Sequence, residues 1–191
     1  MKIRTANILD IDSIMEIENR SFLPQVREKR GLFLERLNVF SGGFILLVDE
    51  SSGVKGGGSK GEKVCGYFCT ERWKEISRGS DIFSVGHDIS KTHCSDGPVL
   101  YISSFAVLPE FRGGGLGGKF FCDALEFIEK SQQGLKEVAL LVNENWSAAR
   151  HIYKKNGFSE CFLIDGVFEN DEGQPENGIV MNKTLEVCHK D

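Results

Sequence analysis

The sequence predicts a single α/β domain, and three observations support that fold class. Short apolar runs of strand length alternate with amphipathic stretches of helical period, the pattern of a mixed sheet covered by helices. A glycine-rich loop at residues 113–118 joins one such run to one such stretch. The length of 191 residues suits one domain with its own core. We therefore expect residues 1–191 to form one domain, a mixed central sheet of about seven strands flanked by about four helices.

Periodicity and helix-breaking residues place the elements along the chain. We predict, in chain order, strand 2–6, helix 11–21, a helix between 26 and 41, strands 44–48, 64–73 and 99–107, helix 116–132, strand 138–142, helix 146–155, and strands 158–164 and 179–184. The first helix has apolar residues at positions 11, 14, 15 and 17, and either Asp10 or Asp12 can cap it. Each of the four predicted helices is followed by a residue that ends it. In chain order these residues are Pro24, Gly42, Gly134 and Gly157.

Two long polar segments interrupt these elements. Residues 50–63 are rich in glycine and include Gly58-Ser59-Lys60, but a strand follows them and not a helix, so we predict a flexible hairpin loop and not a phosphate loop. Residues 74–98 show no regular period. An irregular segment of this length in a compact domain is usually functional or mobile, so we predict a loop on the substrate side.

Composition excludes several function classes. The net charge is −5 with no basic stripe, which argues against nucleic acid as a partner. No apolar run approaches the ~20 residues that span a bilayer, and the N-terminus lacks the apolar core of a signal peptide, so we expect no membrane partner and a cytoplasmic location. The six cysteines are scattered without a Cys-x-x-Cys pair. His87, His93 and Cys94 do not have the spacing of a zinc site, so we expect no metal.

The loop before the third helix has the chemistry of a pyrophosphate cradle. Five of the six residues 113–118 are glycine, which permits positive φ and close approach of a ligand to the main chain. The free N–H groups of the following first helical turn favour an anion. A nucleotide-binding Walker loop requires Gly-Lys-Ser/Thr, whereas Lys119 is followed by Phe120.

Two motifs in this region resemble one known family. Arg112-x-x-Gly115-x-Gly117 is similar to the acyl-CoA pyrophosphate loop of the GNAT superfamily of N-acetyltransferases. The segment 148–158, which reads Ala-Ala-Arg-His-Ile-Tyr-Lys-Lys-Asn-Gly-Phe, resembles that family's second signature. The resemblance implies acetyl-CoA as cosubstrate, held in a cleft between two splayed central strands. It implies that the cofactor-binding residues are Phe105, Ala106, Val107, Arg112, Gly113, Gly114, Gly115, Leu116, Gly117, Gly118 and Asn145.

Asn145 is the one position in that set that departs from the family pattern. The family often has asparagine seven residues before the signature tyrosine, where this chain has Trp146. Within the superfamily, the closest resemblance is to the arylalkylamine N-acetyltransferase-like branch. The segments that carry it are 21–24, 40–44 and 93–97.

The resemblance also suggests how the chemistry is divided. Tyr153 matches the tyrosine that lies near the acyl-CoA sulfur, and it would act as general acid toward the leaving thiolate. A backbone N–H near residues 105–107 would stabilise the developing oxyanion. The two histidines that relay the amine proton in the arylalkylamine branch are replaced by Tyr101 and Ser103. We predict His93 as the substitute, because histidine titrates near neutrality. Glu71 and a chain of ordered water remain open alternatives.

These inferences together predict an acetyl-CoA-dependent N-acetyltransferase that acetylates a primary amine by direct transfer. A small molecule is the preferred amine, and the N-terminus or a lysine of a protein or peptide is the alternative. A non-catalytic acyl-CoA sensor also stays open, because the two relay histidines are missing. The expected partners are acetyl-CoA and the amine, and the expected assembly is a monomer or a homodimer.

Overall fold

The computed structural model describes residues 1–51, 61–78, 81–84 and 86–185. The central part of the predicted hairpin loop at 50–63 therefore lies outside the described residues. So do three positions of the predicted substrate-side loop.

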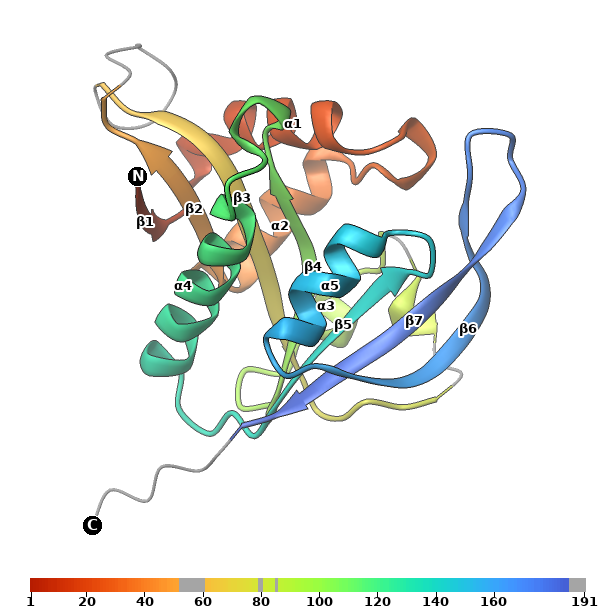
Figure 1. Ribbon diagram of the computed structural model, residues 1–191. Coiled ribbons are helices and arrows are strands. Elements are labelled where there is room, and N and C mark those ends of the chain that lie inside the picture. Colours follow the sequence, from red (N-terminus) through yellow and green to blue (C-terminus); the bar gives the residue numbers. More distant parts are fainter. Residues whose placement is uncertain (52–60, 79–80, 85, 186–191) are drawn as a thin grey trace.

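One seven-stranded sheet organises the described chain (Figure 1), in the order β1-β2-β3-β4-β5-β7-β6. The strands are β1 Lys2–Thr5, β2 Phe44–Asp49, β3 Lys63–Trp73, β4 Val99–Val107, β5 Glu137–Asn143, β6 Ser159–Glu169 and β7 Pro175–Thr184. Only β4 and β5 pair in parallel, and every other neighbouring pair is antiparallel. The predicted mixed sheet of about seven strands is therefore confirmed.

Helices cover both faces of this sheet (Figure 1). They are α1 Ile11–Ser21, α2 Arg30–Val39, the short α3 Ile89–Thr92, α4 Leu116–Ser131 and α5 Ser147–Lys155. On one face, Ile14 of α1 and Phe33 of α2 pack in the same cluster as Phe44 of β2. On the other face, Phe121 of α4 and Tyr153 of α5 belong to a separate cluster with strand residues. The N-terminal helices thus form one layer, and α4 and α5 form the other.

Two regions differ in extent from the sequence prediction. The second helix is shorter, because Pro24–Val26 forms a separate 3-10 turn, η2, and α2 begins only at Arg30. The last hairpin is longer, since β6 runs to Glu169 and β7 starts at Pro175. Its distal part is mostly exposed and polar, so it lacked the apolar pattern by which the strands were predicted.

The feature that positions the site is the divergence of β4 from β5. Their pairing runs only from Val99↔Glu137 to Ile102↔Leu140. Beyond Ile102, β4 continues beside β3 alone, while β5 continues beside β7. The register of β3 and β4 also shifts at this point, which leaves Ser103 as a bulge residue. A gap therefore opens in the middle of the sheet, bordered by residues 103–107.

Candidate active site

A cavity of ≈ 560 Å³ lies where the two strands diverge. Its lining comes from both faces of the sheet, so the cavity passes between the strands and does not rest on one face. We call the part lined by Arg112, Gly117 and Tyr153 the cradle end. The part lined by Glu18, Glu28 and His87 is called the acidic end. A cavity of this volume is in the usual range for small-molecule sites.

The cradle end is formed by the turn from β4 into α4. Gly113, Gly114 and Gly115 have φ values of 87°, 56° and 81°, a region that other residues rarely adopt. Gly115 is the N-terminal cap of the 16-residue helix α4. Within the described chain, no acceptor is bonded to the backbone N–H groups of Gly113, Gly114, Gly115, Gly117 and Gly118. Five free donors at a helix N-terminus form a site for an anion such as a pyrophosphate.

Arg112 contributes to the shape of this loop as well as to its charge. Its side chain is exposed, and its Nε–H donates to the carbonyl oxygen of Val107 at 2.8 Å. The bond fixes the start of the loop to the end of β4, so the guanidinium lies beside the cavity.

The edge of β4 beyond Ile102 faces the gap. Phe105, Ala106 and Val107, all predicted to bind a cofactor, line the cavity. Their β5-facing edge has no strand partner in the described structure. Backbone groups on an open edge in the interior are available to a ligand.

Tyr153 borders the same cavity from α5. The side chain is buried, and its ring packs 5.2 Å from that of Phe121. No hydrogen-bond partner for its hydroxyl occurs among the described residues. Burial raises the pKa of Tyr153 well above its ordinary value, so the phenol carries its proton throughout the physiological range. Tyr153 therefore presents a neutral O–H donor.

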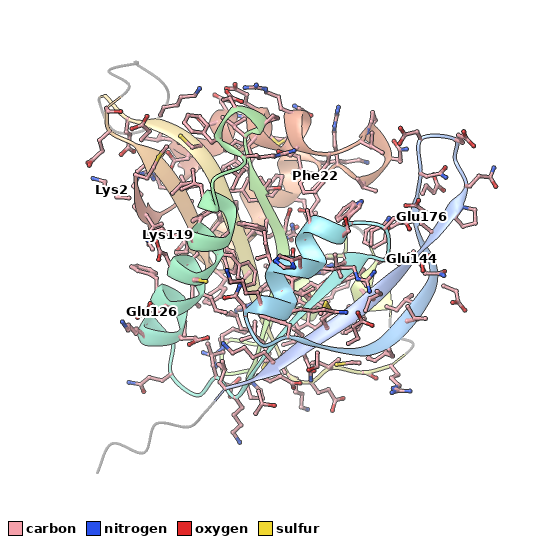
Figure 2. The ribbon with its side chains drawn as sticks, in the orientation of Figure 1. Lys2, Phe22, Lys119, Glu126, Glu144 and Glu176 are labelled. Atoms are coloured by element: carbon pink, nitrogen blue, oxygen red, sulfur yellow. The ribbon has the colours of Figure 1, made fainter. Side chains whose placement is uncertain are left out.

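The roof of the cavity comes from three separate elements. Phe22 at the end of α1 lies 5.8 Å from Trp146, and Trp146 lies 5.4 Å from Phe168 of β6, measured between ring centroids. Figure 2 shows Phe22 between the N-terminal helices and α5. In addition, Gln25 Nε2 donates to the carbonyl oxygen of Asn170 at 2.8 Å, linking η2 to the β6–β7 hairpin. These contacts link the N-terminal helices to α5 and the β6–β7 hairpin beside the cavity.

Asn145 lies beneath this roof, next to Trp146. It lines the cavity, but its Nδ2 donates to Glu176 Oε1 at 2.9 Å. Its side chain is thus already engaged with β7.

At the acidic end, Glu18 of α1 is 1% exposed. Its carboxylate accepts hydrogen bonds from the Tyr67 hydroxyl and, at 2.7 Å, from the backbone N–H of Glu28. Tyr67 in turn shares a hydrogen bond of 2.7 Å with Ser104 of β4. Burial raises the pKa of Glu18 to about 7. This network joins α1, β3 and β4 at the gap.

Two further buried carboxylates lie at or near the acidic end, and each has a cationic or titratable partner. Glu28 forms a buried ion pair with Arg36 of α2. Glu71 of β3 is fully buried, bonds to His87 Nε2, and accepts a hydrogen bond of 2.5 Å from Thr92. Burial pushes the pKa of Glu71 upward, but the bonds from His87 and Thr92 outweigh it, so its pKa is below the ordinary value.

His93, the proton acceptor predicted from the sequence, lies apart from the cavity lining. Its Nδ1 accepts the backbone N–H of Arg72 at 3.3 Å, and its ring packs 5.2 Å from that of Phe40. Burial lowers its pKa below the ordinary histidine value. The geometry gives no support to a role for His93 at the site.

Sequence reasoning missed Glu18 and the pairing of His87 with Glu71. Glu18 carried a readable signal, because it falls one turn after the buried Ile14 on an otherwise apolar helix face. His87 carried none, since it lies in an irregular segment and reaches Glu71 only through the tertiary fold.

In the part of the chain that the structure describes, no three histidine, cysteine or acidic residues are grouped to hold a metal ion. None of the helices in the described ranges combines the length and the apolar character needed to cross a bilayer.

Comparisons with known proteins agree with this architecture. Residues 61–160 match the acetyltransferase (GNAT) domain family. No curated protein matches the chain. Among solved structures, a GphF GNAT-like decarboxylase in complex with isobutyryl-CoA is similar with a TM-score of 0.75 and 16% identity over 97% of this chain and 100% of that one.

Two further solved structures illustrate the range of these similarities. The loading GNATL domain of CurA from Lyngbya majuscula has a TM-score of 0.76 and 15% identity, over 96% of each chain. The ribosomal-protein-S18-alanine N-acetyltransferase from Escherichia coli has a TM-score of 0.65 and 18% identity, over 100% of this chain and 97% of the other. At such identities the likeness shows the fold alone.

Proposed function

The chain belongs to the acetyltransferase (GNAT) domain family, and from this premise we propose that it transfers an acetyl group from acetyl-CoA to a primary amine. The observation that carries the proposal is the continuous cavity between two diverging strands. At one end it has five free backbone N–H groups and a neutral buried tyrosine, and at the other a group of carboxylates. A thioester donor and a cationic acceptor would suit these two ends.

The residues of the cradle end fit acetyl-CoA. The free N–H groups of Gly113, Gly114, Gly115, Gly117 and Gly118 would bind the pyrophosphate together with Arg112. The open strand edge of residues 105–107 would bind the arm of CoA that carries the thioester. A backbone N–H of this edge would also donate to the carbonyl oxygen of the acetyl group, where negative charge develops during the reaction. When bound, acetyl-CoA supplies an activated acetyl thioester.

Tyr153 is the proposed general acid. Its hydroxyl keeps its proton at neutral pH, lines the cavity and has no competing partner in the described chain, so it can donate a hydrogen bond to sulfur as the thiolate leaves. Its raised pKa makes it a weaker acid than an exposed tyrosine. We therefore expect its contribution to lie at the lower end of the usual range.

The acceptor is proposed to be a small amine. The aromatic contacts of Phe22, Trp146 and Phe168, with the link from Gln25 to Asn170, restrict the acidic end. An arylalkylamine belongs among the candidates, because aromatic side chains line this roof. A protein N-terminus or lysine is the alternative acceptor, and a non-catalytic acyl-CoA sensor is the alternative function.

One assay separates these possibilities. Purified protein would be incubated with acetyl-CoA and a panel of alkylamines, arylalkylamines and short peptides, with release of free thiol as the readout. Turnover of a small amine supports the proposal, and turnover of peptides alone favours the protein-directed alternative. Tight acetyl-CoA binding by calorimetry without any turnover would identify a sensor.

A further inference from the structure

Glu18 is a buried carboxylate at the acidic end whose charge is not compensated by an ion pair. Within the described chain, no cationic group lies within ion-pair distance of it, whereas Glu28 is paired with Arg36 and Glu71 bonds to His87. A buried charge without a counterion is costly unless a proton or a cationic ligand meets it. Because Glu18 lines the cavity, that ligand can come from the cavity.

The position of Glu18 relative to the gap is fixed by its hydrogen bonds. The Tyr67 hydroxyl joins its carboxylate to Ser104, which directly precedes Phe105 on the open edge of β4. Ser104 faces the same layer as Ala106, on the side of the N-terminal helices. An amine at the acidic end would thus approach the gap from the opposite face to Tyr153.

We propose that Glu18 binds the ammonium group of the acceptor and accepts its proton, an inference that rests on the proposed N-acetyltransferase function. The bond from nitrogen to hydrogen breaks, a carboxyl O–H forms, and the ammonium becomes a neutral amine. The nitrogen lone pair then forms the C–N bond, and the C–S bonding pair leaves with sulfur. The second proton lost by nitrogen balances the thiolate, giving CoASH. Glu18 returns its proton to water when the amide leaves.

The electrostatic surroundings suit that exchange. Burial and the negative charge of Glu28 raise the pKa of Glu18, while the bonds from Tyr67 and the Glu28 N–H and the charge of Arg36 lower it. The result is a pKa of about 7, so both protonation states are accessible near neutral pH. These are the charged and titratable groups that face it from β3, α2 and the segment after η2.

Glu18→Gln is the appropriate variant, since it removes the charge while its side-chain oxygen can still accept the Glu28 N–H. Glu16→Gln on the same helix is the matched control, because Glu16 is exposed and bonds only Arg20 in the described structure. For an ordinary primary amine at pH 7, Glu18→Gln should lower kcat/KM roughly 10²-fold, the size of a lost general base. Glu16→Gln should retain the wild-type value.

The pH profile and a second substrate separate catalysis from packing. Wild-type kcat/KM should rise with pH through an apparent pKa near 7. This rising limb of the pH profile should be missing in Glu18→Gln. It should be present in His87→Gln, even if that variant is slower overall. A weakly basic amine that is already neutral at the assay pH needs no proton acceptor, so the defect of Glu18→Gln should shrink to less than about tenfold. An equal defect with both amines, or an unchanged limb, would overturn the role of Glu18.

A binding measurement distinguishes failure of this inference from failure of the proposed function. Calorimetry with CoA-saturated protein should show a primary ammonium binding at least about tenfold more weakly to Glu18→Gln than to wild type. The corresponding alcohol should bind both proteins alike. Equal ammonium binding refutes the inference even if the enzyme turns over. An intact ammonium preference without any turnover refutes the N-acetyltransferase function and the proton transfer, and it limits Glu18 to binding the cation.

Discussion

The Nε–H of Arg112 donates to the carbonyl oxygen of Val107, 2.8 Å away, so the last residue of β4 is bonded to the residue that opens the glycine loop. The arginine therefore has two separable effects on CoA, one through its charge and one through the shape of the loop. A salt titration can distinguish them, because only the first is screened.

Arg112→Ala should weaken CoA binding at low ionic strength by more than at high ionic strength, while a residual loss persists at high salt. The persistent part reflects the missing bond to Val107. Calorimetric CoA affinities at two salt concentrations measure both parts. Arg112→Lys keeps the charge and lacks the guanidinium Nε–H, so it should recover mainly the salt-dependent part. A loss that disappears completely at high salt would contradict the structural part.

Gly115→Val should reduce CoA affinity tenfold or more, which is at least ~1.4 kcal/mol. Gly115 has a φ of 81°, so a β-branched residue there strains the loop as well as blocking the approach of phosphate. Gly117 lies within α4, and a Cβ added there would meet only Ile152, at 4.0 Å. Gly117→Val should therefore lose CoA affinity with little change in thermal stability. If Gly117→Val binds CoA normally, phosphate does not approach that turn of the helix.

Tyr153→Phe should lower kcat by roughly 10²-fold and leave CoA affinity nearly unchanged, since only the hydroxyl is removed. Tyr101→Phe removes a second hydroxyl from the cavity lining, on the other face of the sheet, and should lose far less. The defect of Tyr153→Phe should decrease with an acyl donor whose thiol leaves more readily. Wild-type kcat in a folded Tyr153→Phe protein would mean that the tyrosine only packs against Phe121.

Glu18 should also make the stability of the protein depend on pH. Its pKa is raised from 4.5 to about 7 on folding, so the folded state favours the protonated form, and stability is lost as pH rises through this window. The Glu18→Gln variant should not show this loss of stability, because glutamine does not titrate. The difference in unfolding free energy, variant minus wild type, should therefore increase by up to roughly 3 kcal/mol between pH 4 and pH 8. Urea unfolding at both pH values measures it, and a constant difference would show that the carboxyl titrates normally.

His93→Gln tests the prediction made from the sequence. A role for His93 as proton acceptor requires that the variant lose the rising limb of the kcat/KM profile, which for His93 would lie below ~6.5 because burial lowers its pKa. Because His93 packs against Phe40 outside the cavity lining, we expect the limb and the amine KM to persist. Steady-state profiles of His93→Gln and Glu18→Gln, measured with the same amine, decide between the two residues.

The parts of this protein that follow from the sequence are those with local causes. The strand Val99–Val107 and the helix Ile11–Ser21 agree with the predicted ranges, because their apolar periods are unbroken. Glycine permits the positive φ values seen at Gly113, Gly114 and Gly115, whereas Gly117 and Gly118 lie in the helix. The bond from His87 to Glu71 could not be predicted, since a loop without a period gives no information about which strand residue it will meet. The distal part of the last hairpin was missed because exposed strands need no apolar run.

The short seam between β4 and β5 has a mechanical consequence. The sheet consists of two parts, β1–β4 and β5–β7, which we call plates. The backbone pairing between them is confined to Val99–Ile102 of β4 and the facing residues of β5. A molecule held in the gap touches both plates, so its binding energy also resists their separation. Binding of a ligand in the gap should therefore raise the free energy of unfolding of the whole domain. The protein should be most resistant to unfolding when the gap is occupied.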